Sequence, residues 1–156
     1  MSIKLAAFDV DGVMTDGSIT YDDNGVEYKT FNSKDGHGIV ELHKAGIITA
    51  IITGRTSGAV EKRAKDLQVS EVYQGVEDKM AVLEELLGKY NLTMAETAYM
   101  GDDIPDICIL EKVELAGCPK DAVQEVKDVV NFEADKNGGC GAVREFCDCI
   151  LKLNRN

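Results

Sequence analysis

Residues 5–13 read Leu5-Ala6-Ala7-Phe8-Asp9-Val10-Asp11-Gly12-Val13. The apolar run indicates a buried strand, and Gly12 allows the chain to turn sharply just beyond it. Asp9 and Asp11 therefore follow the carboxyl end of a strand, which is where open α/β sheets place their binding sites. Because two neighbouring carboxylates repel each other, we expect a positive group, most simply a divalent metal, to lie beside them.

Length and composition bound the class of protein. The 156 residues suffice for one domain with a substantial core, so we expect a single domain over residues 1–156. The formal net charge of −11 argues against nucleic acid and anionic membrane surfaces as partners. The N-terminal apolar stretch is too short for a signal peptide or a membrane span. Five cysteines without a CxxC pair favour reduced thiols over a zinc site, so we expect a cytoplasmic protein.

Short apolar segments alternate with amphipathic segments along the whole chain. We expect further strands at residues 47–52, 69–73, 97–100, 115–118 and 129–132. Helices are expected at residues 35–45, 57–67, 78–90, 105–112, 121–127 and 142–153. This alternation predicts an α/β fold, a Rossmann-like parallel sheet with helices on both faces.

Two segments depart from simple alternation in an informative way. Residues 18–21 and 26–31 flank Asp22-Asp23-Asn24-Gly25, and Asn-Gly predicts a β-hairpin with a two-residue turn, inserted after the first strand. Asp35 is then expected to cap the helix at 35–45. The apolar side of that helix is expected to carry Ile39, Val40, Leu42 and His43.

Residues able to carry out chemistry recur where the predicted strands end. Thr53 and Arg55 follow the second long strand, Asp102 and Asp103 follow the strand at 97–100, and Lys79 opens a helix. In a parallel sheet these strand ends share one edge, so the side chains converge. Taken singly, each has an ordinary explanation, such as a surface turn, a strand exit, a solvated lysine or a helix cap. Their occurrence in this order favours a shared site.

That set of groups suits phosphoryl transfer. Asp9 is the expected nucleophile, which would form an aspartyl-phosphate. Asp11 is the expected acid that protonates the leaving oxygen and then activates water. Thr53 and Lys79 would hold the phosphoryl oxygens, and Asp102 would complete a magnesium site with Asp9.

The sequence resembles the haloacid dehalogenase superfamily at these positions. The superfamily's four motifs match Asp9-Val10-Asp11-Gly12-Val13, Ile52-Thr53-Gly54-Arg55, Lys79, and Gly101-Asp102-Asp103-Ile104-Pro105-Asp106. The resemblance implies Mg²⁺ as cofactor, with Asp11 contributing to the metal through its backbone carbonyl. It makes Asp103 and Asp106 supporting acids without ranking them. Between the first two motifs there is room only for the hairpin and one helix, so we expect a member without a cap domain.

Within that superfamily, the chain is similar to the 3-deoxy-D-manno-octulosonate 8-phosphate phosphatases. The segment from Phe31 to Ile39 resembles the family's sugar pocket, and Arg55 stands where relatives acting on a nine-carbon keto acid have glutamate. An arginine can bind the sugar-acid carboxylate through two hydrogen bonds. The tail Gly138-Gly139-Cys140-Gly141-Ala142-Val143-Arg144-Glu145 resembles a motif that enters the neighbouring subunit's site. The substrate-binding residues implied are Asn32, Ser33, Lys34, Asp35, Gly36, Arg55, Arg63 and Arg144.

The resemblance implies a magnesium-dependent phosphatase that acts on 3-deoxy-D-manno-octulosonate 8-phosphate in lipopolysaccharide precursor synthesis. It also implies a homotetramer in which a neighbour covers each site. Three departures from the family pattern, at Lys34, His37 and Val40, bear on the exact substrate. The alternatives are therefore a phosphatase of a nonulosonate 9-phosphate (2-keto-3-deoxynononate or N-acylneuraminate) and a catalytically silent tetrameric module.

Overall fold

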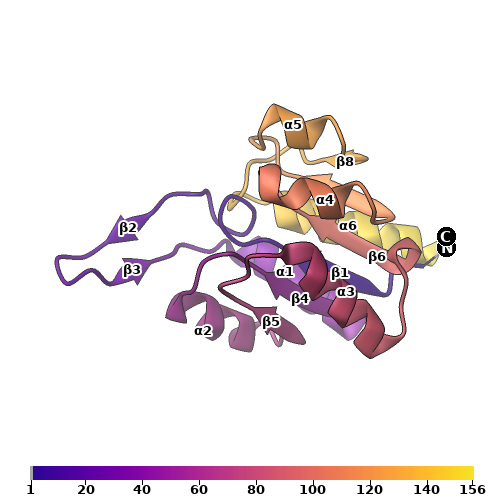
Figure 1. The fold of residues 1–156 in the computed structure, drawn as a ribbon, viewed down its shortest axis with the longest axis horizontal. Coiled ribbons are helices and arrows are strands. Elements are labelled where there is room, and N and C mark those ends of the chain that lie inside the picture. Colours follow the sequence, from indigo (N-terminus) through magenta and orange to yellow (C-terminus); the bar gives the residue numbers. More distant parts are fainter. Residues whose placement is uncertain (1) are drawn as a thin grey trace.

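A parallel sheet forms the centre of the molecule (Figure 1). The computed structural model describes residues 2–156, and within them six strands are paired in the order β5-β4-β1-β6-β7-β8, each parallel to its neighbours. Their bounds are β1 (Leu5–Phe8), β4 (Ile48–Ile52), β5 (Glu71–Tyr73), β6 (Thr97–Met100), β7 (Leu115–Cys118) and β8 (Phe132–Glu133). The predicted α/β class with a parallel sheet is confirmed.

Helices cover both faces of the sheet, as predicted (Figure 1). β1 shows why, since Ala6 and Phe8 pack into one apolar core while Leu5 and Ala7 pack into the other. The first core is completed by α1 (Ser33–Lys44), α2 (Gly58–Asp66) and α6 (Ala142–Arg155). The second is completed by α3 (Lys79–Tyr90), α4 (Ile107–Leu110) and α5 (Gln124–Lys127). Both faces of the sheet are thus covered by apolar side chains, which explains why the strand sequences are almost entirely apolar instead of alternating with polar residues.

The hairpin after β1 projects from the sheet as an arm (Figure 1). It consists of β2 (Thr20–Tyr21) paired antiparallel with β3 (Glu27–Tyr28), so its ladder is shorter than predicted. The predicted two-residue turn is wrong, because the backbone N–H of Asp22 donates to the carbonyl of Val26 and closes a three-residue loop. Gly25 takes a positive φ of 77° in that loop, the conformation that three-residue hairpin loops require.

The cap of α1 differs from the prediction. Asn32, not Asp35, is the cap residue, and its side chain accepts hydrogen bonds from the backbone N–H groups of Lys34 and Asp35. Asp35 is instead buried against the start of α6, where it accepts the N–H of Arg144 at 3.0 Å. His43 is exposed rather than on the apolar side, because the buried stripe of α1 runs through Gly36, Gly38, Ile39 and Leu42.

Shorter corrections concern the carboxyl-terminal half. The last strand begins at Phe132, not at 129, because the backbone N–H of Val129 still donates to the carbonyl of Val126 at the end of α5. The helix predicted at 105–112 is a 3₁₀ turn (Ile104–Asp106) followed by α4, and α5 starts only at Gln124. A further 3₁₀ turn covers Met94–Glu96. All five cysteines are free.

The topology brings three strand ends together. β1 lies between β4 and β6, and the backbone N–H of Asp9 donates to the carbonyl of Met100 at 3.0 Å. After β1 the chain adds β4 and β5 on one side of it and then crosses to add β6, β7 and β8 on the other side. A crevice therefore opens at the carboxyl ends of the central strands. From Asp11 to Thr53 the described chain contains the hairpin, α1 and β4, and no cap domain. No helix within residues 2–156 is long and apolar enough to cross a membrane.

Candidate active site

The loop after β1 carries Asp9 and Asp11 and is fixed by its own backbone. The carbonyl of Val10 accepts the N–H groups of Val13, Met14 and Thr15, which folds the loop into a tight turn. Gly12 takes φ = +83°, and a Cβ atom there would lie 1.9 Å from Oδ2 of Asp102. Only glycine satisfies both conditions, since other residues strain the backbone and displace Asp102.

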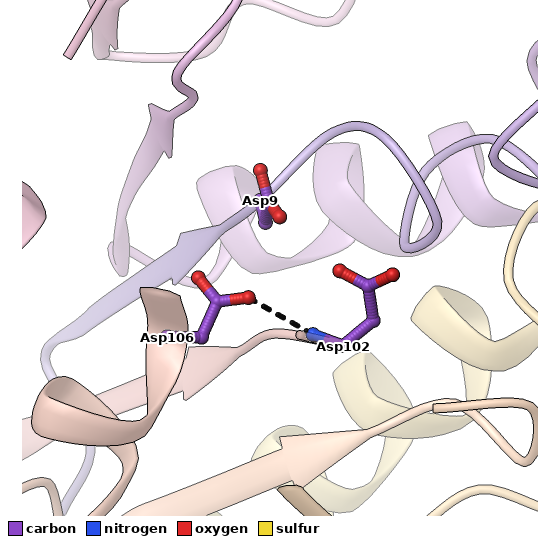
Figure 2. A group of neighbouring side chains, drawn as sticks. All are labelled: Asp9, Asp102 and Asp106. Atoms are coloured by element: carbon purple, nitrogen blue, oxygen red, sulfur yellow. Dashed lines mark hydrogen bonds between the residues drawn. The ribbon is translucent and has the colours of Figure 1, made fainter. Parts of the chain in front are cut away.

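Three carboxyl groups meet at the crevice. Asp9, Asp102 and Asp106 each offer an oxygen within 4.8 Å of the others, and Figure 2 shows their carboxyl groups facing a common space. Asp9 follows β1 and is 7% exposed, whereas Asp102 follows β6. Bringing buried like charges this close is costly without a cation.

Lys79 supplies one positive charge to this group. It is the first residue of α3, which Asp78 caps through a hydrogen bond to the N–H of Ala81. The Nζ atom of Lys79 lies 2.8 Å from Oδ1 of Asp106 and 3.3 Å from Oδ1 of Asp9. Burial would lower the pKa of Lys79, but Asp9 and Asp106 outweigh it and raise the pKa above its ordinary value. Lys79 is therefore a fixed cation.

Asp106 and Asp103, which the sequence could not rank, have different roles. Asp106 is fully buried, and its Oδ1 accepts from Lys79 and, at 2.6 Å, from the hydroxyl of Tyr99. Its Oδ2 accepts the backbone N–H groups of Asp102 and Asp103, the first of which is drawn in Figure 2. These contacts use the acceptor capacity of a carboxylate, so Asp106 orients its neighbours. Asp103 is exposed and caps the following 3₁₀ turn.

The remaining carboxylates of the group, Asp9 and Asp102, fit a hard divalent cation. Burial first, and then the charge of Asp106, raises the pKa of Asp9 to about 6. Burial first, and then the charges of Asp9 and Asp106, raises the pKa of Asp102 to about 8. Both shifts reflect burial together with neighbouring negative charge that Lys79 does not fully offset. Oxygen donors with excess negative charge are the ligand set that Mg²⁺ prefers.

A cavity of about 510 Å³ opens over these groups. Beside Asp9, Lys79 and Asp102, its lining includes Thr53 and Arg55 from the loop after β4. Thr53 is buried, and its backbone N–H donates to the carbonyl of Tyr73, so β5 holds it in place. The cavity is large enough for a small phosphorylated metabolite.

Asp11 lies at the rim of this cavity, apart from the three clustered carboxylates. Its Oδ1 accepts from Nζ of Lys29 at 2.6 Å, and its Oδ2 lies 3.8 Å from Nε of Arg55. Arg55 also forms an ion pair with Glu27 of β3. Sequence reasoning did not identify Lys29, Glu27 or Tyr99, and the signal for the first two was the alternation in Val26-Glu27-Tyr28-Lys29.

The other predicted substrate residues lie outside this cavity, around the start of α1. Ser33 and Lys34 are exposed, whereas Gly36 packs so closely on Arg63 that a Cβ atom would lie 2.3 Å from its Nη2. Arg63 also lies over the ring of Phe31, 5.9 Å from its centroid. Asn32 and Asp35 hold the backbone, as described above. A contribution of this group to substrate binding stays a prediction.

The glycine-rich segment at 138–141 contacts its own chain. A Cβ atom on Gly138 would lie 1.9 Å from the carbonyl oxygen of Gly12, and the N–H of Gly139 donates to the carbonyl of Val13. These glycines therefore support the loop that carries Asp9. Arg144, three residues further on, pairs with Asp148 along α6 at 3.2 Å. Entry of Arg144 into a neighbouring site stays a prediction.

Comparisons with known proteins agree with this geometry. Residues 68–146 match the family model of haloacid dehalogenase-like hydrolases. The chain is 41% identical over 150 residues to the 3-deoxy-D-manno-octulosonate 8-phosphate phosphatase KdsC of Yersinia pestis, covering 96% of this chain and 80% of that protein.

Solved structures are similar throughout the chain. The phosphatase of that name from Moraxella catarrhalis, in complex with magnesium, phosphate and KDO, is 42% identical with a TM-score of 0.96, covering 99% of this chain and 88% of that one. A probable YrbI family phosphatase from Pseudomonas syringae is 44% identical with a TM-score of 0.96, covering 98% and 87%.

Proposed function

The chain belongs to the haloacid dehalogenase-like hydrolases and, within them, to the family of 3-deoxy-D-manno-octulosonate 8-phosphate phosphatases, and from this membership we propose its reaction. It hydrolyses 3-deoxy-D-manno-octulosonate 8-phosphate to the free sugar acid and phosphate, with Mg²⁺ as cofactor, as a step of lipopolysaccharide precursor synthesis. The observation that carries this proposal is the convergence of Asp9, Lys79 and Asp102 beneath one cavity.

Asp9 and Asp102 are the side chains that would hold the metal, together with the backbone carbonyl of Asp11. When bound, Mg²⁺ supplies positive charge that offsets these carboxylates and the phosphoryl oxygens. Asp106 does not compete for this role, because Lys79, Tyr99 and two backbone N–H groups occupy its oxygens.

In the first step a carboxylate oxygen of Asp9 attacks phosphorus and forms an aspartyl-phosphate. The bond between phosphorus and the sugar oxygen breaks, and its electron pair stays on that oxygen. The carboxyl of Asp11 gives the sugar oxygen a proton, so that an alcohol leaves instead of an alkoxide.

In the second step water attacks the phosphorus of the aspartyl-phosphate. Asp11, now a carboxylate, takes a proton from that water. The bond between phosphorus and the Asp9 oxygen breaks, which restores Asp9 and releases inorganic phosphate. Lys79 and Thr53 stay in place through both steps and hold the phosphoryl oxygens, whose charge would otherwise oppose the attack of Asp9.

Arg55 is the residue we assign to the substrate carboxylate. It lines the same cavity as Asp9, its side chain is 42% exposed, and it forms an ion pair with Glu27. A guanidinium can bind a carboxylate through two parallel hydrogen bonds, and a simple phosphate ester has no carboxylate for it to bind. Arg55 therefore favours a sugar acid as substrate.

We further propose a homotetramer and a cytoplasmic location. The arm formed by β2 and β3 exposes Ile19, Tyr21, Val26 and Tyr28, each more than half accessible. Apolar side chains concentrated on a short, projecting hairpin are suited to pairing with other copies of the chain. Five free cysteines suit a reducing compartment.

Phosphate release from a substrate panel tests the reaction. The panel contains 3-deoxy-D-manno-octulosonate 8-phosphate, 2-keto-3-deoxynononate 9-phosphate, N-acetylneuraminate 9-phosphate and a hexose phosphate, each with and without Mg²⁺. A magnesium-dependent preference for the octulosonate is expected. A preference for a nine-carbon acid overturns the substrate but keeps the mechanism, and no turnover of any ester indicates a silent module.

A further inference from the structure

The reaction described above does not use Lys29, whose side chain is almost completely covered. It follows β3 on the return strand of the hairpin, and its side chain is only 2% exposed. Its Nζ atom lies 2.6 Å from Oδ1 of Asp11 and 3.0 Å from Oε1 of Glu27. Burial would lower the pKa of Lys29, but its hydrogen bond to Asp11 and its ion pair with Glu27 raise the pKa above its ordinary value. Lys29 thus remains charged, and a buried lysine is rare unless it is paired in this way.

The alternation of side chains along the return strand of the hairpin explains why Lys29 faces Asp11. Successive side chains on a strand point to opposite sides, so Val26 and Tyr28 share one side of the hairpin and Glu27 and Lys29 share the other. Val26 is 51% exposed and Tyr28 is 57% exposed, whereas Glu27 and Lys29 face the loop that carries Asp11. The hairpin therefore presents two charged groups to the site.

These charges are balanced. Glu27 pairs with Lys29 and also with Arg55, and Asp11 lies between Lys29 and Arg55. Once Asp11 has given up its proton and become a carboxylate, two carboxylates and two cations alternate, so their formal charges cancel. Glu27 compensates the ammonium that contacts Asp11, which lets Lys29 fix the carboxyl group by hydrogen bonding without adding a net charge.

We infer, on the basis of the phosphatase function proposed above, that Lys29 is a positioning residue for the acid Asp11, and that Glu27 holds Lys29 in place. Lys29 binds Oδ1, which leaves Oδ2 to serve the oxygen of the leaving group. Lys29 is absent from the described residues that line the cavity, so it acts through Asp11 and does not touch the substrate. The hairpin is in this way part of the catalytic apparatus as well as a surface.

The leaving group distinguishes this role from a purely structural one. A sugar alkoxide is a strong base and leaves only when Asp11 delivers a proton, whereas 4-nitrophenolate is a weak base and leaves without one. A misplaced Asp11 therefore impairs cleavage of a sugar phosphate more than cleavage of 4-nitrophenyl phosphate. The value of kcat/KM reports events up to departure of the leaving group, so later hydrolysis of the aspartyl-phosphate does not obscure the comparison.

The test measures kcat/KM of Lys29→Met with 3-deoxy-D-manno-octulosonate 8-phosphate, with glycerol 3-phosphate as a simple alkyl ester, and with 4-nitrophenyl phosphate. We expect a loss of about 10–100-fold on the alkyl esters, the range that misplacement of a catalytic group produces. The loss on the aryl ester is expected to be smaller by a factor of about 10. Lys29→Arg, which keeps the charge, should show the same bias with a smaller loss.

Lys89→Met is the matched control, because Lys89 forms a 2.5 Å ion pair with Glu71 away from the site. It should show no bias between the esters. An equal loss on alkyl and aryl esters in the Lys29 variants overturns the inference. If Lys29→Met does not fold, as judged by circular dichroism, the bias of Lys29→Arg decides in the same way.

The same measurements distinguish a wrong substrate assignment from a wrong inference about Lys29. If the wild type cleaves glycerol 3-phosphate but not the octulosonate ester, the assigned substrate is wrong, and the alkyl-to-aryl comparison still decides the role of Lys29. If the wild type cleaves no ester, both proposals are overturned.

Discussion

The Nζ atom of Lys79 lies 3.3 Å from Oδ1 of Asp9, the side chain expected to attack phosphorus. The same ammonium donates to Asp106 at 2.8 Å, so one cation serves two buried carboxylates. The position follows from local structure, because Asp78 caps α3 and Lys79 is the first residue of that helix. The cation is thus fixed by the backbone of α3 before any substrate arrives, which is the preorganisation that electrostatic catalysis requires.

Replacement of Lys79 by Met should impair both catalysis and stability. Removing a preorganised charge beside the phosphoryl group should lower kcat by roughly 10²–10³-fold. Leaving Asp9 and Asp106 without their cation should lower the free energy of unfolding by about 3–5 kcal/mol. Phosphate release and urea denaturation measure the two effects. The control Lys89→Met removes a pair whose lysine is 57% exposed, and it should cost less than about 1 kcal/mol. A Lys79 variant that matches this control contradicts the assignment.

The stability of the metal-free protein should fall as pH rises from about 4 to about 8. The folded pKa of Asp9 is about 6 and that of Asp102 is about 8, both above the ordinary value of 3.8. Between these limits the folded state holds more protons than the unfolded state, so raising the pH favours unfolding, and the loss is complete above the folded pKa. Thermal melting at pH 5, 6, 7 and 8 in the presence of a chelator measures the trend.

Asp102→Asn provides the matched variant for this trend. It removes the charge with the more strongly raised pKa, so the metal-free variant should be more stable than the wild type at pH 8, by on the order of 1–3 kcal/mol. At this chain length each kcal/mol corresponds to roughly 2–4 °C in Tm. The variant should also lose the stabilisation that Mg²⁺ gives the wild type. A wild-type Tm that rises between pH 5 and pH 8 without metal would contradict the prediction.

Tyr99→Phe tests whether Asp106 depends on its buried hydroxyl partner. The hydroxyl of Tyr99 donates to Oδ1 of Asp106 at 2.6 Å, and the side chain is fully buried. Without this donor a buried carboxylate is incompletely satisfied, so the free energy of unfolding should fall by about 1–3 kcal/mol. Tyr28→Phe removes a hydroxyl that donates to Asp22 in an exposed bond of 3.3 Å, and it should change the free energy of unfolding by less than about 0.5 kcal/mol whether or not the ring of Tyr28 contacts another copy. Equal effects in urea denaturation would show that the Tyr99 hydroxyl is not important to Asp106.

The sequence predicted the parallel sheet and the convergence of its strand ends well, because both depend on local patterns. Apolar strands such as Ile48–Ile52 are buried on both faces, and the residues after them must share one edge. The cap of α1 was predicted incorrectly because Asn32 and Asp35 are both good cap residues. Only the tertiary structure shows that Asp35 is instead buried against α6, where it accepts the backbone N–H of Arg144.

Residues that act through long-range contacts could not be predicted. Lys29 meets Asp11 across 18 residues, and Tyr99 appears in the sequence as one more apolar residue of a strand. Asp103 and Asp106 are equally acidic in sequence, and their roles separate only because the turn at Ile104–Asp106 buries one and exposes the other. Burial of a polar group is a tertiary property, and periodicity carries little information about it.

Arg55→Ala should impair binding of a sugar acid more than chemistry at phosphorus. Arg55 lines the cavity, but the cation beside Asp9 is Lys79, and Arg55 forms ion pairs with Glu27 and Asp11. Loss of a charged hydrogen-bonding partner costs about 1.5–3 kcal/mol, so KM for 3-deoxy-D-manno-octulosonate 8-phosphate should rise by roughly 10–150-fold. A hexose phosphate has no carboxylate, and its kcat/KM should fall much less. Lys62→Ala, at an exposed lysine of α2, is the control and should affect neither substrate. Steady-state kinetics on both esters decide the matter, since an equal loss would mean that Arg55 serves the phosphoryl group instead of the carboxylate.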